Sequence, residues 1–182
     1  MENIFKITEG ILNRYKLDIP SCPYPLDVER FDGLEQMSAL YHYTIRFTSS
    51  HPDLTAKMML SKTATLSMGV GKLLDSVVGK IVHGVVTNFR RLAGSRDQVT
   101  YEIILEPFIS LLDKQFRTHR FFVNKSVPEV VEQILGEHGL KRWEYEFKLK
   151  QTYPKREQIN QYQESDLEFI ERLLAEVGIF YF

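Results

Sequence analysis

Apolar and polar residues alternate without a break along residues 41–48, and this period of two most restricts what the chain can fold into. Successive side chains of an extended strand point to opposite faces of a sheet, so the segment predicts a strand with one buried face. The apolar face carries Tyr41, Tyr43, Ile45 and Phe47, and the polar face carries His42, Thr44, Arg46 and Thr48.

Three further segments of the first half have strand character: residues 26–31, 81–89 and 99–106. Between the last two, residues 91–96 predict a hairpin connection with Gly94 as its turn residue. Strands joined by hairpins are antiparallel, and several in succession favour a barrel or a sandwich. Residues 53–60 predict a short helix that Asp53 opens.

The pattern changes near Pro107, after which helices are expected. Ser126 and Glu129 form a capping box with Pro128 in the first turn, and Gly139 follows as a left-handed C-cap. A strand is expected over residues 143–150, which alternate like 41–48.

A second capping box, Ser165 with Glu168, opens another helix, and Gly178 ends it. Asp166 is expected on the exterior of this helix, as are Glu168, Glu171 and Glu176. Residues 179–182 are an apolar strand sequence, so the chain is expected to be a fragment or to have a paired end. The expected domains are 1–107, an incomplete barrel, and 108–182, an α/β segment that continues further.

Composition disfavours several classes of function. The formal net charge is −1, from 23 basic and 24 acidic residues, whereas nucleic-acid partners favour a basic surface. The single cysteine, Cys22, allows no intrachain disulfide, and its role is left open. The first ten residues lack the apolar stretch of a signal peptide, and no run of about 18 apolar residues suggests a membrane span.

No pattern for catalysis, cofactor or metal binding is found. The five histidines have no metal-ligand spacing: His42, His51, His83, His119 and His138. The glycines of residues 68–72 lack phosphate-loop spacing and favour a hairpin turn. Glu102 and Glu106 are expected to lie roughly 13 Å apart on a solvated strand face, too far for a glycosidase pair. Arg90, Arg91 and Arg96 favour a solvated turn over an anion site.

The last third of the chain resembles the VgrG family of type VI secretion spike proteins. Residues 126–139 resemble its "SVPEIV…IL…HG" stretch, and residues 156–182 resemble "RE…QY-x-ESD-x-x-FI" continuing into "RLLEEEGIxYxF". Upstream, residues 83–89 resemble its "HGxVTxF" strand. Ala175 and Val177 depart from the family's usual acidic residues on the surface of the helix.

The resemblance implies an α+β fold: an antiparallel β-barrel like a phage tail hub, with an α/β insertion that carries the two capped helices. It implies a non-enzymatic hub with two barrels per chain, which forms a homotrimer and caps the hexameric Hcp tube. Baseplate, effector and adaptor proteins are the other expected partners, without nucleic acid, cofactor or membrane insertion. The protein is expected in the cytoplasm during assembly and is then secreted without a signal peptide.

Two alternatives remain open at this stage. The hub of a prophage contractile tail has the same fold and nearly the same mechanics, and neighbouring genes distinguish the two. The second alternative is an enzyme, a tail-associated cell-wall hydrolase. The full-length sequence would distinguish such an enzyme from a structural hub.

Overall fold

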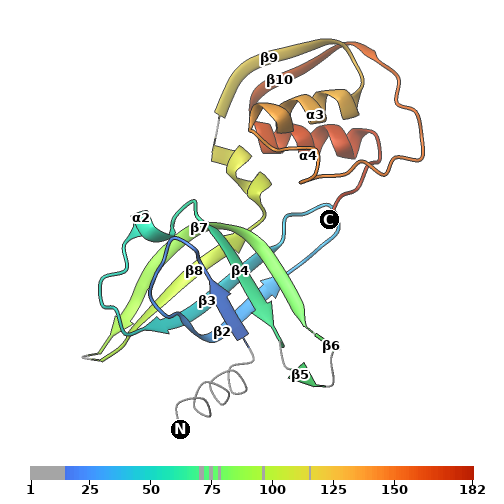
Figure 1. Cartoon of the computed structure of the whole chain (residues 1–182). Helices are drawn as coiled ribbons and strands as arrows, with labels where there is room; N and C mark the ends of the chain where they lie inside the picture. The colour runs from blue at the N-terminus through green and yellow to red at the C-terminus, as the bar shows by residue number, and fades with distance from the viewer. Residues whose placement is uncertain (1–14, 70–71, 74–75, 78, 96, 115) are drawn as a thin grey trace. The chain divides into compact units, whose positions relative to one another are not determined.

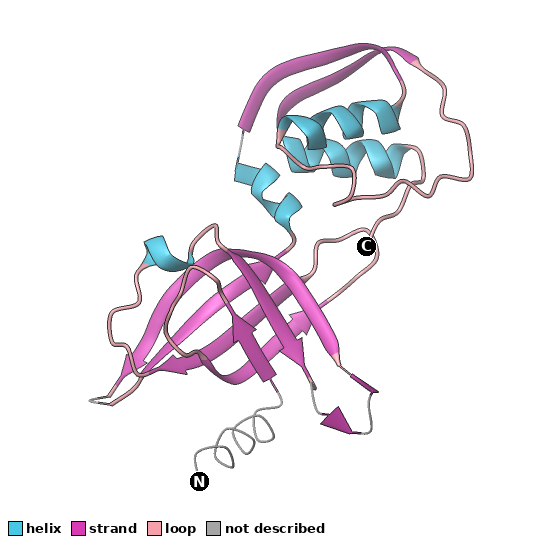
Figure 2. Ribbon diagram, in the orientation of Figure 1, coloured by secondary structure: helices cyan, strands magenta, loops and turns pink. Residues whose placement is uncertain are grey.

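The computed structural model describes residues 15–69, 72–73, 76–77, 79–95, 97–114 and 116–182. The chain divides into two compact units, Met1–Glu35 with Tyr41–Phe108 and Gln36–Leu40 with Ile109–Phe182. The first unit is an antiparallel sheet and the second combines a β-ribbon with helices (Figure 2). The expected α+β class, a barrel with an α/β segment, is confirmed.

Six strands of the first unit form one antiparallel sheet in the order β1-β4-β7-β8-β3-β2 (Figure 1). They are β1 (Tyr15–Asp18), β2 (Asp27–Leu34), β3 (His42–Ser49), β4 (Thr63–Met68), β7 (Lys80–Gly94) and β8 (Val99–Glu106). The rings of Tyr15 in β1 and Phe31 in β2 meet edge to face at 5.1 Å, so the two edge strands approach and the barrel nearly closes. A separate pair, β5 (Lys72–Leu73) and β6 (Ser76–Val77), completes the β-structure of this unit.

The alternating residues of β3 and β8 supply the barrel core as expected. Ile45, Phe47 and Ile103 are fully buried, and Tyr101 is 1% exposed. Tyr101 lies between the rings of Phe47 and Phe89, with centroids 5.7 and 5.5 Å away. Its hydroxyl donates to the carbonyl oxygen of Pro52 at 2.7 Å and thereby attaches the loop after β3 to the core.

Several boundaries differ from the expectations. The helix expected over 53–60 is only α2 (Ala56–Met59), with Thr55 and not Asp53 before its first residue. The strand expected over 81–89 extends through Gly94, so Gly94 ends a strand, and the Ser95 N–H donates to the Gln98 carbonyl oxygen just beyond it. The hairpin expected over 68–72 includes residues 70–71, which lie outside the described part of the chain.

The second unit is built on a two-stranded antiparallel ribbon and two helices. Its elements are the 3-10 helix η1 (Phe108–Lys114), β9 (Phe116–Lys125), α3 (Val127–Glu137), β10 (Arg156–Ser165) and α4 (Asp166–Glu176). The first residue of η1, Phe108, is also the last residue of the first unit. Both helices bury an apolar stripe in a second core, which includes Ile134, Phe169 and Leu173, each fully buried.

The helix ends follow the sequence signals closely. The Glu129 and Glu168 carboxylates accept hydrogen bonds from the backbone N–H groups of Ser126 and Ser165, at 2.7 Å in each box. At the other ends, Gly139 and Gly178 have positive φ angles of 85° and 70°. Both predicted capping boxes and both left-handed glycines are therefore confirmed.

Two predicted strands of the second unit are wrong. Residues 143–150 form no ladder, although Tyr145 and Phe147 pack against the second core while their neighbours are exposed. The alternation therefore predicted correctly which side chains face the core, but not a strand. Residues 179–182 also form no strand, and the Tyr181 carbonyl oxygen accepts a single backbone hydrogen bond from Ser38 at 2.8 Å.

Candidate functional site

The outer face of the barrel carries a row of four charged side chains on four neighbouring strands. Arg30 on β2 is in register with Arg46 on β3, which is in register with Glu102 on β8, which is in register with Arg90 on β7. Bulges lie beside the row, between Val28 and Arg30 and at two places in β7. A bulge changes the direction in which the following side chains point, so these irregularities help to bring the four charged side chains together.

Glu102 is the centre of this row, and it is nearly inaccessible although it faces outward. Glu102 is only 4% exposed. Arg46 Nε donates a hydrogen bond to one of its carboxylate oxygens and Arg90 Nε donates to the other, each at 2.7 Å. The hydrogen bond from Arg46 and the charge of Arg90 lower the pKa of Glu102, against burial, which acts to raise it. The carboxylate therefore stays ionised and locks β3, β8 and β7 together.

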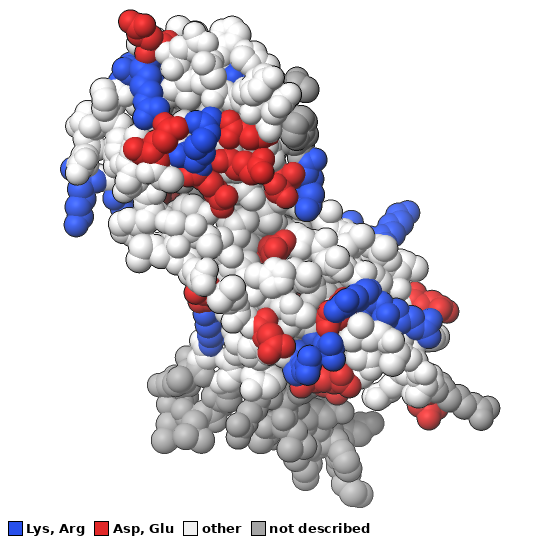
Figure 3. All heavy atoms as spheres, turned by 180° about the vertical axis from the view of Figure 1, so that it is seen from behind, with Lys and Arg blue, Asp and Glu red and all other residues white. Residues whose placement is uncertain are grey.

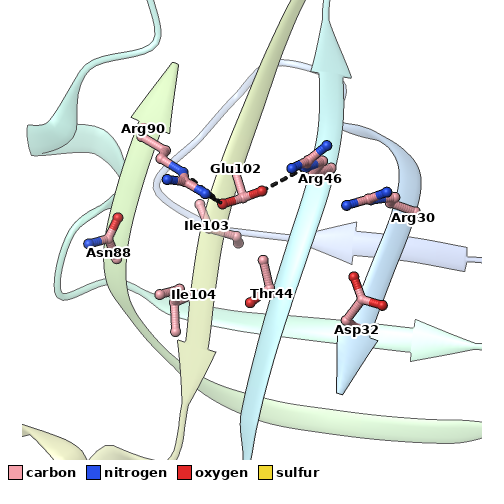
Figure 4. Close-up of a pocket in the computed structure, with 9 residues that line it drawn as sticks. All are labelled: Arg30, Asp32, Thr44, Arg46, Asn88, Arg90, Glu102, Ile103 and Ile104. Carbon is pink, nitrogen blue, oxygen red and sulfur yellow. Dashed lines mark hydrogen bonds and ion pairs between the residues drawn. The ribbon is translucent and has the colours of Figure 1, made fainter. Parts of the chain in front are cut away.

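A second row, two residues further along the strands, completes a shallow hollow (Figure 4). This row consists of Asp32, Thr44, Ile104 and Asn88 on the same four strands. Together the two rows line a volume of about 310 Å³. Sites of this size are at the lower end for small-molecule binding, and this one has an open, charged rim and no deep apolar interior. It suits the recognition of a side chain better than the enclosure of a substrate.

The prediction that Glu102 lies on a solvated face is wrong. Its burial follows from the two arginines that cover it, and their positions depend on strand register, which local sequence does not reveal. Arg90 was expected in a solvated turn and instead lies within β7. Glu106 pairs with His42 at 3.0 Å, and Arg96 lies outside the described residues.

A buried polar network occupies the second unit at the motif that resembles VgrG proteins. Asp166 is fully buried and accepts hydrogen bonds from Arg120 at 2.9 Å, from Gln161 at 2.8 Å and from His138 Nε2 at 2.7 Å. Arg120 lies on β9, Gln161 on β10 and Asp166 in the first turn of α4, and His138 is the C-cap residue directly after α3. One carboxylate therefore joins two strands, α4 and the end of α3. The prediction that Asp166 lies on the helix exterior is wrong.

Several motif residues in and beside this network make contacts that stabilise the fold. A buried carboxylate without partners is strongly unfavourable, so Asp166 requires the cation of Arg120 and the amide of Gln161. Ser165 accepts from the Glu168 N–H at 3.1 Å, and Phe169 packs in the core, as the sequence predicted. Within the described part of the chain, no group of three or more His, Cys, Asp or Glu side chains is arranged to hold a metal ion.

The fold defines a class of protein built on an antiparallel barrel with an α/β segment. The family model described as the phage tail baseplate hub matches residues 34–182, and the chain belongs to this family.

Within that class, the chain is similar to spike proteins of the type VI secretion system. It is 30% identical over 166 residues to the spike protein VgrG1a of Pseudomonas aeruginosa and 32% identical over 165 residues to VgrG4b of the same organism. Each match covers 91% of this chain, which spans 25% and 19% of the two relatives.

A solved structure supports the same relationship. The Escherichia coli c3393 protein, a component of the type VI secretion system, is 39% identical with a TM-score of 0.82. The match covers 92% of this chain and 44% of that one. The resemblance to the hub region of VgrG proteins is thus confirmed.

Proposed function

We propose that this chain is the hub portion of a type VI secretion spike, which trimerises and caps the Hcp tube. The main support is the E. coli c3393 structure, which matches nearly the whole chain at 39% identity. In this proposal, residues 1–107 belong to the first barrel of the hub, which later strands complete, and residues 108–182 are an α/β segment inserted after the barrel's initial strands. Two barrels per chain in a trimer present six similar surfaces to six tube subunits.

Symmetry matching explains how such a hub binds without one dominant patch. Six contacts made together give high avidity even when each is weak. The visible face in Figure 3 carries acidic and basic side chains close together on each unit, with no broad surface of one sign. The protein acts as a mechanical part, is assembled in the cytoplasm and is expelled with the tube. No helix of the described chain is long and apolar enough to cross a membrane.

The test is the oligomeric state of the full-length protein and its binding to purified Hcp hexamers. Light scattering should give the mass of three chains, and electron cryomicroscopy should show a ring of six barrels seated on the hexamer. A monomer or dimer at micromolar concentration, without a threefold ring, would contradict the proposal. A ring that binds a phage tube protein and not Hcp would favour the prophage hub.

A further inference from the structure

The charges in the outer row of the barrel do not balance. Three guanidinium groups, those of Arg30, Arg46 and Arg90, line the hollow, whereas only two carboxylates do, and Glu102 is the one that lies in the same row. Arg90 binds it through two nitrogens, and Arg46 binds it through Nε. Arg30 makes no hydrogen bond or ion pair with any residue that the structure describes, and neither does Asp32 in the adjacent row.

The position of Arg30 makes this imbalance unfavourable for the isolated chain. Arg30 is directly opposite Arg46 in the register of β2 and β3, and like charges at opposed positions destabilise a sheet. Both side chains point into the same hollow, beside each other in Figure 4. A protein retains an unfavourable local arrangement where function requires it, and here an incoming anion would relieve the repulsion.

The terminal nitrogens of Arg46 complete the binding geometry. Because Arg46 contacts Glu102 through Nε, its two terminal amino groups remain available, and its side chain is 35% exposed. A planar guanidinium binds a carboxylate through two parallel hydrogen bonds. Thr44 and Ile104 in the second row offer a hydroxyl group and an apolar contact for the methylene carbons of a side chain.

We propose that this hollow docks a glutamate or aspartate side chain of another protein, held between Arg30 and Arg46. The inference rests on the proposed function only in assuming that the chain assembles with protein partners. A nucleic acid is a poorer match because the chain has a formal net charge of −1, whereas nucleic-acid partners favour a broad basic surface.

A second copy of this chain is also a poorer source of the docked carboxylate, because the acidic side chains of its most acidic element, α4, are not free. The carboxylates on and beside α4 already have partners. Glu164 and Glu176 pair with Arg172 at 2.6 and 2.8 Å, Glu168 caps its own helix, and Glu171 accepts from Tyr181 at 2.6 Å. A second copy therefore offers no free carboxylate at α4, and the proposal commits to a different protein as the source.

Photo-crosslinking in the assembled apparatus tests this directly. Benzoylphenylalanine in place of Asn88, at the rim of the hollow, is introduced into the full-length protein, and crosslinked peptides are identified by mass spectrometry. We expect crosslinks to a segment of another protein that contains an aspartate or glutamate. Arg30→Glu should reduce their yield about tenfold or more, because a repelled carboxylate replaces a paired one. Changing the partner's acidic residue to lysine should restore the yield.

Two controls separate binding from folding. Lys57→Glu reverses a charge at an exposed position of α2 that does not line the hollow, and it should leave the crosslinks unchanged. The melting temperature of Arg30→Glu should not fall, because the introduced carboxylate faces Arg46. Loss of crosslinking together with a lowered melting temperature would assign Arg30 a folding role and overturn the proposal.

The remaining outcomes are also decisive. Crosslinks only to other copies of this chain, no crosslinks at all, or crosslinks that Arg30→Glu leaves intact would each refute the docking site. If the wild-type protein forms its ring on the Hcp hexamer in these cases, the proposed function stands while this inference fails. If no ring forms but an acidic segment of another protein is captured and charge reversal rescues it, the docking site stands alone.

Discussion

Single residues in this protein act by joining elements that lie far apart in the sequence. Glu102 joins three strands of the barrel through two arginines, and Asp166 joins two strands and a second helix to its own helix. Both carboxylates are nearly or fully buried, so each depends on its cationic partners for stability. Their removal should affect whole units and not single contacts.

Glu102→Gln should reduce the free energy of unfolding by about 2 kcal/mol at pH 7, because hydrogen bonds to charged groups each contribute about that much. The contribution of Glu102 to the free energy of unfolding of the wild-type protein should also depend on pH. Because the folded-state pKa of Glu102 is lowered, its stabilisation is complete above the unfolded pKa of about 4.3 and is lost as pH falls toward the folded value.

Denaturant unfolding at pH 7, 5, 4 and 3 measures this effect. The difference in the free energy of unfolding between wild type and Glu102→Gln should be constant above about pH 5 and should shrink as the pH falls below about 4.3. The matched control is Glu146→Gln, whose side chain is 70% exposed and which should change stability by less than about 0.5 kcal/mol. A constant difference across the pH range would refute the charge-based explanation.

At the scale of elements, helices could be predicted from the sequence because their signals are local. The capping boxes and terminal glycines lie within a few residues of the ends that they define, and all four signals are confirmed. Strands β3 and β8 could also be predicted, because their inward residues are apolar and alternate with polar ones.

Strands β9 and β10 were missed because their pattern is inverted. Their inward positions include the polar residues Arg120 and Gln161, while their outward positions include Phe121 and Tyr162, which are 59% and 64% exposed. The charged row was missed for a different reason. Local sequence does not give the register that places Arg46 and Arg90 on either side of Glu102.

The end of α4 allows a conformational prediction. Gly178 has a φ of +70°, and a Cβ added there would meet no atom within 4 Å, so the penalty for a larger residue is backbone strain alone. Gly178→Val should lower the free energy of unfolding by about 1–2 kcal/mol. Gly178→Asn should have a smaller effect, because asparagine tolerates this region. Equal melting temperatures for wild type and Gly178→Val would disprove the assignment.

Strand pairing in the barrel gives a steric prediction. A Cβ on Gly84 would lie 2.3 Å from the carbonyl oxygen of Glu106, so Gly84→Ala must separate β7 from β8. The expected loss is about 1–3 kcal/mol, typical of overpacking. Gly136→Ala in α3 is the control, since a Cβ added at Gly136 would meet no atom within 4 Å. It should stabilise the protein by about 0.5–1 kcal/mol, and a similar change in both variants would contradict the steric argument.

At the scale of the whole molecule, the two units have separate hydrophobic cores. The barrel core includes Ile45 and Leu105, and the second core includes Ile134 and Leu173, with no residue in common. Each unit therefore has its own source of stability, which is the usual property of a domain.

Leu173→Ala should accordingly act within one unit. Leu173 is fully buried, so its truncation should cost about 2–5 kcal/mol. Amide hydrogen exchange followed by mass spectrometry should show faster exchange across residues 109–182 and unchanged protection across residues 41–49 and 99–106. Uniformly faster exchange in both units would show that they unfold as one.

The stack of Phe47, Tyr101 and Phe89 fills the interior of the barrel. Because aromatic rings occupy this space and Tyr101 attaches a loop to it, the described part of the barrel encloses no conduit. If the proposed ring of six barrels forms, whatever passes the hub would have to use the central opening that the ring encloses. The exterior side chains of the strands that face this opening would then govern passage, whereas substitutions in the barrel interior would change stability.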